Sequence, residues 1–116
     1  MAITSELIGK LGGADVEVIP VEASNSGNRG SEIILHTVEV PEGESWLIMV
    51  VGDMSSSTSP NGAPDLMLGS IKTNRYKTQN RMTVAGIHTG TVDAKIVKNT
   101  SSGTDSFVGE LYTVKL

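Results

Sequence analysis

The chain has no cysteine among its 116 residues. A disulfide framework, a thiolate metal site and a thiol nucleophile are therefore excluded. Aromatic residues are nearly as scarce, with one Trp, two Tyr and one Phe. Proteins that stack single-stranded nucleic acid need several exposed rings, so this composition argues against that function. An apolar core must come mainly from Val, Ile, Leu and Met.

Long apolar runs are also missing. No stretch of 18 or more apolar residues is present, so no transmembrane helix is expected. Glu6 falls where a secretory signal needs an uninterrupted apolar stretch, and no basic region precedes it. We therefore expect no signal peptide, no membrane partner and synthesis in the cytoplasm. The length predicts one domain.

Catalytic and cofactor motifs are absent from the sequence. It has neither the G-x-S-x-G elbow of serine hydrolases nor a glycine-rich phosphate loop. His36 and His88 are the only imidazoles, and no cluster with metal-ligand spacing surrounds them. We expect both to be hydrogen-bonded strand residues. Asp53 and Asp65 flank one loop, but their spacing supports neither a glycosidase pair nor a calcium loop. The sequence thus predicts no enzyme, no metal and no cofactor.

The charge is divided along the chain. Residues 1–44 hold eight acidic residues and two basic ones, whereas residues 72–98 hold six basic residues and one acidic one. Such stretches are typical of solvated faces, and they also suit self-complementary packing in an assembly. The densest stretch, KTNRYKTQNR at 72–81, could be solvated surface or could contact an acidic partner subunit or a charged polymer. The overall formal charge of −4 argues against nucleic acid.

The first thirteen residues, MAITSELIGKLGG, differ from the rest of the chain. Apolar residues recur at roughly helical spacing, Thr4 or Ser5 could cap a helix start, and Gly12-Gly13 could end it. A helix this short needs a surface to pack on. The sequence predicts a docking segment at 1–13, helix or arm, ahead of a domain at 14–116. Its apolar residues are Ile3, Leu7, Ile8 and Leu11.

After Gly13 the pattern changes to short alternating runs separated by turn residues. Strands are expected at 15–21, 32–40, 45–51, 65–71, 82–88, 91–97 and 107–116, with Gly69 as a bulge. Residues 23–31 and 52–64 are expected to be loops. This spacing predicts an all-β fold, an antiparallel β-sandwich that is jelly-roll-like, with a barrel as the alternative.

One strand is apolar on both sides. In WLIMVV, Trp46, Ile48 and Val50 face one way, while Leu47, Met49 and Val51 face the other. Such a strand is either covered on both faces or presents an interface. The candidate interface residues are therefore Ile3, Leu7, Ile8, Leu11, Leu47, Met49, Val51, Lys72, Arg75, Tyr76, Lys77 and Arg81.

Three stretches carry a resemblance to a known class of proteins. The opening MAITSELIGKLGG, the hairpin VEVPEGESWLIMVV and the closing GTVDAKIVKN and GELYTVKL together resemble small β-rich structural proteins of tailed bacteriophages, especially those infecting actinobacteria. The resemblance implies a non-catalytic virion component, a minor tail protein or a capsid decoration protein. Its partners would be other virion proteins and copies of itself in a symmetric assembly. The alternative is a carbohydrate-binding module for host attachment, for which only Trp46 and Tyr76 could supply a platform.

Overall fold

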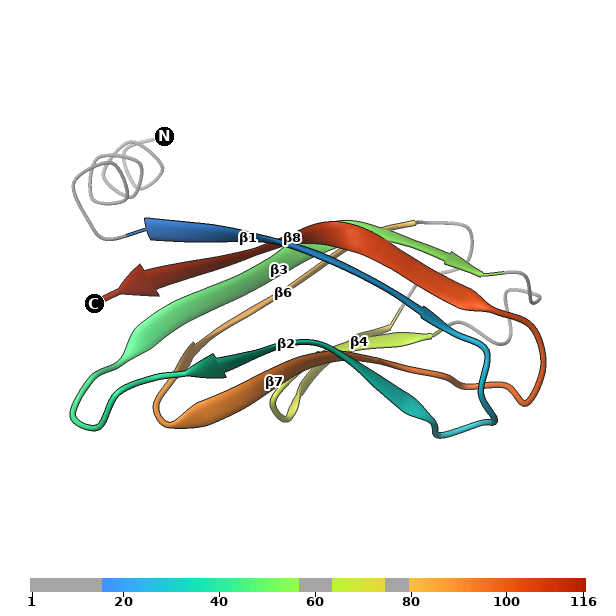
Figure 1. Ribbon diagram of the computed structural model, residues 1–116, viewed down its shortest axis with the longest axis horizontal. Helices are drawn as coiled ribbons and strands as arrows, with labels where there is room; N and C mark the ends of the chain where they lie inside the picture. Colours follow the sequence, from blue (N-terminus) through green and yellow to red (C-terminus); the bar gives the residue numbers. More distant parts are fainter. Residues whose placement is uncertain (1–15, 57–63, 75–79) are drawn as a thin grey trace.

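A computed structural model describes residues 16–56, 64–74 and 80–116 (Figure 1). The predicted docking segment at 1–13 and the candidate residues Arg75, Tyr76 and Lys77 lie outside the described residues. Their proposed roles therefore stay predictions. Every regular element in the described ranges is a strand, and no helix there is long and apolar enough to cross a membrane.

The described strands form two four-stranded antiparallel sheets, in the orders β1-β8-β3-β6 and β2-β7-β4-β5. The sheets lie one over the other as a sandwich (Figure 1). Their strands are β1 (Val16–Asn25), β2 (Glu32–Glu39), β3 (Trp46–Ser56), β4 (Asp65–Leu68), β5 (Ile71–Asn74), β6 (Arg81–His88), β7 (Thr91–Val97) and β8 (Asp105–Lys115).

The pairing is nested. β4 pairs with β5, β3 with β6, β2 with β7 and β1 with β8, as in one long hairpin. Rolling this hairpin brings β3 beside β8 and β4 beside β7, which is the jelly-roll arrangement. The predicted jelly-roll-like sandwich is confirmed, and the barrel alternative is wrong because the strands divide into two separate sheets.

Two strands run further than their sequence suggests. Residues 23–25 and 52–56 were expected to be loop, yet they belong to β1 and β3. Both extensions pair with β8, and Ser24 and Ser106 join their hydroxyl oxygens at 3.0 Å across the β1–β8 pair. Pairing with a neighbouring strand outweighs the turn preference of Ser, Gly and Asn. Pro20 lies within β1, where an edge strand tolerates it.

Two local expectations are wrong. Residues 65–71 do not form one bulged strand, because Gly69 has a φ of 60° and turns the chain between β4 and β5. Its N–H donates to the Asp93 carbonyl at 2.9 Å. The irregularity lies instead in β2, where the register shifts between Ile34 and His36. Ile34 therefore lies on the exposed side of its sheet, whereas Val38 is buried.

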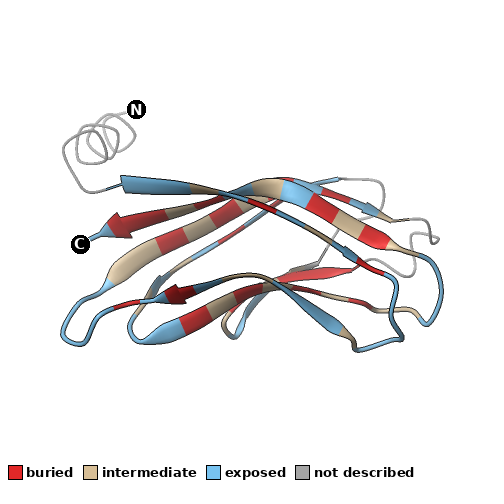
Figure 2. Cartoon of the chain, in the orientation of Figure 1, coloured by how far each residue is buried: buried red, intermediate tan, exposed pale blue. Residues whose placement is uncertain are grey.

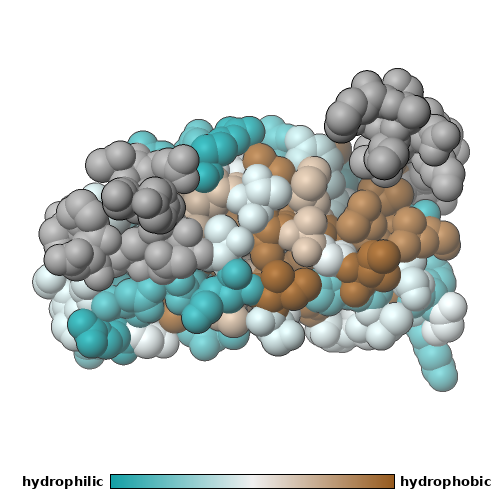
Figure 3. Space-filling model, turned by 180° about the vertical axis from the view of Figure 1, so that it is seen from behind, coloured by the Kyte–Doolittle hydropathy of each residue, from teal (hydrophilic) through white to brown (hydrophobic). Residues whose placement is uncertain are grey.

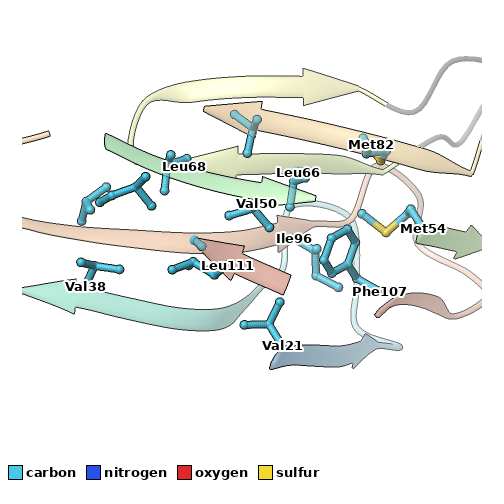
Figure 4. Close-up of a cluster of buried hydrophobic side chains, with 14 of the residues drawn as sticks. Val21, Val38, Val50, Met54, Leu66, Leu68, Met82, Ile96, Phe107 and Leu111 are labelled. Carbon is cyan, nitrogen blue, oxygen red and sulfur yellow. The ribbon is translucent and has the colours of Figure 1, made fainter. Parts of the chain in front are cut away.

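The core lies between the sheets and is built mainly from aliphatic side chains, as predicted. Buried and exposed positions alternate along most strands (Figure 2). Phe107 is the largest fully buried apolar side chain and lies among residues of both sheets, including Met54 and Ile96 (Figure 4). Of the double apolar run in β3, Ile48 and Val50 face this core. Trp46 packs at the edge of this core, whereas Leu47, Met49 and Val51 must meet something outside the sandwich or remain in contact with water.

Candidate interaction surface

The two outer faces of the sandwich differ in polarity. On the outside of β2-β7-β4-β5, Lys95 binds Glu32 with 2.5 Å between Nζ and Oε1. Nearby, the Thr37 hydroxyl donates to Asp93 at 2.7 Å. These groups leave Ile34 as an isolated exposed hydrophobic residue among polar neighbours. This face has the character of an ordinary wet sheet surface.

The outer face of β1-β8-β3-β6 is apolar over the half at which β8 finishes. Strand register sets its residues in rows that cross all four strands. Aliphatic residues make up the first row entirely, and a single tyrosine interrupts the second. From β1 to β6, the first row is Val16, Val114, Leu47 and Ile87, and the second is Val18, Tyr112, Met49 and Ala85. We call these eight residues the apolar face.

Several members of the apolar face are open to solvent. Ile87 is 66% exposed and Val18 is 50% exposed, and both lie on edge strands. Leu47 and Met49, in the middle of the sheet, are half-buried by their neighbours. Seen from the side of β5 and β6, hydrophobic colour gathers over the middle and toward the end at which β8 finishes (Figure 3). Contiguous apolar surface of this kind marks interaction sites.

The rest of this sheet face is mixed, with charged and hydroxyl side chains beside Pro20, Val51 and the exposed Val108. The third row brings Val51 beside Glu110 and Thr83, and the fourth brings Asp53 beside Arg81. Asp53 and Arg81 approach to 3.7 Å while remaining well exposed, so their ion pair contributes little stability. Tyr112 donates a hydrogen bond to Glu110, and this bond, aided by desolvation, raises the pKa of the tyrosine. The hydrogen bond thus turns the hydroxyl toward Glu110 in the third row.

The candidate residues predicted from sequence fall on two faces. Leu47, Met49 and Val51 lie together on the outside of β3, and Arg81 lies at the polar end of that same face. Lys72 is exposed on β5, in register with Met67, and belongs to the opposite outer face. The structure thus brings the three described apolar candidates together and separates the two described basic ones.

The basic stretch is not one continuous surface in the described residues. Lys98 is fully buried, and its Nζ donates to the Ser102 carbonyl at 2.6 Å and to Thr100 at 3.3 Å. Lys95 is paired with Glu32. The interpretation of 72–98 as one charged patch is therefore wrong for these two lysines.

Sequence reasoning did not include Val16, Val18 and Ile87 among the candidates. The alternation of residues 15–21 puts Val16 and Val18 on one side of a strand, but nothing in their own segment shows which strand lies beside them. Their places in the apolar face come from pairing with β8, whose residues are about ninety positions away. The only signal in the sequence was the alternation along residues 81–88, which places Thr83, Ala85 and Ile87 on the side away from the core. Many ordinary edge strands show the same pattern.

Residues with catalytic potential do not converge in the described part of the chain. No three His, Asp or Glu side chains there are placed to hold a metal ion. Asp53 is on β3 and Asp65 is on β4, in different sheets. The expected hydrogen bonding of His88 is not fully met, because its buried Nε2 has no partner among the described residues.

Trp46 is poorly placed to form a sugar-binding platform. Its indole N–H donates to Glu44 at 3.0 Å, and the Lys115 ammonium lies 5.5 Å from the ring centroid. The ring also packs against the core. A bound sugar would have to displace Lys115 to stack on this side of the ring.

No protein-family model and no curated protein matches the chain. Solved structures match its fold. The VP2 subviral particle of infectious bursal disease virus aligns over 87% of this chain with a TM-score of 0.57 and 15% identity. The T13 particle of that virus gives a TM-score of 0.58 and 14% identity. The chain spans about a third of the length of these viral proteins, 33% and 31% respectively.

A Bacillus endospore appendage subunit also aligns, over 89% of this chain and 90% of its own, at 6% identity and a TM-score of 0.48. For the viral proteins, identities this low establish a shared fold alone. The fold of this chain is thus one that is also found in a virus particle protein.

Proposed function

We propose that the protein is a non-catalytic structural subunit of a tailed-phage virion, either a minor tail protein or a capsid decoration protein. It is made in the host cytoplasm and acts by packing on copies of itself and on other virion proteins. The apolar face is the observation that carries this proposal, because burying it against another protein surface lowers the free energy of the system. The jelly-roll fold shared with a virus particle protein and the resemblance of the sequence to phage structural proteins support it.

Ile87→Asp tests this use of the apolar face. A carboxylate at the most exposed aliphatic position of the face would have to lose water on association. We expect the dissociation constant of the self-assembled form to rise about 10- to 100-fold, which corresponds to about 1.4 to 2.8 kcal/mol. Sedimentation or light scattering over a concentration series measures it.

Ile34→Asp is the matched control. Ile34 is also an isoleucine on an edge strand and is 55% exposed, but it lies on the polar outer face. This variant should associate like the unmodified chain. Equal weakening by the two substitutions, or a full chain that stays monomeric at every concentration, would contradict assembly through the apolar face.

The location in a virion needs its own test. An antibody against the chain should label purified phage particles at regular positions, on the tail or over the head. If the chain is produced during infection yet is absent from purified particles, the virion assignment is wrong.

A carbohydrate-binding module is the second candidate, and the structure favours it less. It depends on Trp46, whose ring is partly covered by Lys115, and on Tyr76, which lies outside the described residues. Binding of host glycans that is lost in Tyr76→Ala would support it.

A further inference from the structure

The apolar face and the N-terminal segment meet at one point of the chain. Val16 begins β1 and is itself a corner of the apolar face. Only residues 12–15 separate it from the stripe of Ile3, Leu7, Ile8 and Leu11. The apolar face therefore lies next to the attachment point of a segment whose sequence predicts that it packs on an apolar surface.

The two surfaces also agree in size. Residues 3–11 would span at least about 13 Å, because the helical part rises 1.5 Å per residue and the residues up to the Thr4 or Ser5 cap are more extended. The apolar face crosses four strands, and three spacings of about 4.8 Å give it a width of about 14 Å. Such a segment, lying across the strands, would cover both rows from β1 to β6. In a helix Glu6 and Lys10 would lie along one edge of the apolar side, four residues apart, and their long side chains could extend into water.

The direction of β1 favours a contact in which the segment covers the apolar face of a neighbouring copy rather than its own. β1 starts at the end of the sandwich at which β8 finishes and runs along the sheet (Figure 1). The segment is therefore attached to the sandwich at that end. A segment that continued the direction of β1 would reach a neighbour placed beyond this end without a reversal, whereas a segment that covered its own apolar face would need one within residues 12–15.

We propose that residues 3–11 of one copy bind the apolar face of a neighbouring copy. This inference rests on the proposed self-assembly and identifies the contact that produces it. Each copy then offers one segment and accepts one. Two copies that exchange segments reciprocally form a closed dimer, whereas a head-to-tail contact generates a ring or an open filament. A ring or filament suits a part that repeats around a phage tail or over a head.

The absence of cysteine makes a direct test possible. Thr4 is placed on the same side as Leu7, Ile8 and Leu11 in a helix, and Ala85 is an exposed member of the apolar face. Full-length Thr4→Cys and Ala85→Cys proteins are mixed and treated with a short bifunctional maleimide. Since no other thiol is present, we expect covalent dimers in a denaturing gel only when both variants are mixed.

Thr91→Cys is the matched control, since Thr91 is exposed on β7 in the other sheet. Mixed with Thr4→Cys, it should give no dimer. If instead the Thr4→Cys, Ala85→Cys double variant links only within single chains at high dilution and the mixture gives no dimers, the segment covers its own copy and the inference is wrong. Equal linking of Thr4→Cys to positions 85 and 91 would also overturn it.

A charge in the segment separates this inference from the proposed function. Leu7→Asp in the full-length chain should weaken self-association about as much as Ile87→Asp. If Ile87→Asp dissociates the assembly while Leu7→Asp leaves it intact, the apolar face meets another surface; the self-assembly then stands and the inference fails. If the full chain is monomeric and gives no covalent dimers, both fail.

Discussion

Gly109→Ala should remove a large part of the stability of the sandwich. A Cβ atom added at Gly109 would lie 2.2 Å from the Val51 carbonyl oxygen and 2.6 Å from the Gly52 Cα. Both are backbone atoms of β3, the strand paired with β8 in the middle of the sheet, so they cannot move without breaking the ladder. We expect the free energy of unfolding to fall by about 3 kcal/mol or more, at the upper end for overpacking.

Urea unfolding followed through the single tryptophan measures this loss. Trp46 packs against the core, so its fluorescence should report when the sandwich opens. Ser55→Ala is the control, because Ser55 is exposed on β3, the strand that the added Cβ atom at Gly109 would meet. This substitution should change the free energy of unfolding by no more than about 0.5 kcal/mol. A Gly109→Ala protein with an unchanged midpoint would show that the two strands can separate locally at little cost.

The fold class and the positions of most strands were predictable because they depend on local patterns. Alternation in segments such as Thr91–Val97, with glycine-containing turns between them, is enough to indicate an antiparallel sandwich. The ends of strands were not predictable in the same way. Residues 52–56 contain Gly, Asp and Ser, and their own sequence predicts a loop, yet they pair with β8. That neighbour is about fifty residues away in the chain, and only the folded structure places it there.

The candidate surface was half predictable for the same reason. Leu47, Met49 and Val51 could be found because a strand with apolar residues on both sides is unusual within its own sequence. Val18 and Ile87 each look like an ordinary exposed residue of an edge strand. They become part of one surface only when β8 and β3 lie between them.

Charge was the least predictable property. Counting residues placed Lys98 with the basic residues of a surface stretch. The structure buries it completely, and its ammonium donates a hydrogen bond to the carbonyl of Ser102, four residues later, within the turn after β7. A lysine whose ammonium donates to a backbone carbonyl can be buried. Only the course of the loop after β7 shows that such a carbonyl lies within reach of Lys98.

Phe107→Ala is expected to cost about 4 kcal/mol, in the usual range for removing a buried phenylalanine. Phe107 is fully buried, is the only phenylalanine, and lies opposite Met54 in the β3–β8 pair. A domain of this kind has about 5 to 15 kcal/mol of stability in total, so the variant should be close to unfolding. Phe107→Leu keeps much of the volume and should cost less than half as much.

The position of the Phe107 ring also explains why β3 carries a glycine at position 52. A Cβ atom there would lie 2.6 Å from Cζ of Phe107, as well as 2.5 Å from the Val108 carbonyl oxygen. Gly52→Ala should therefore cost less in the Phe107→Leu background than in the unmodified chain, since one of its clashes is with the ring. The backbone clash remains, so the rescue should be partial. Urea midpoints of the two single variants and the double variant measure this coupling. If the two losses of stability simply add, only the backbone of β8 requires glycine at position 52, and the Phe107 ring does not contribute to that requirement.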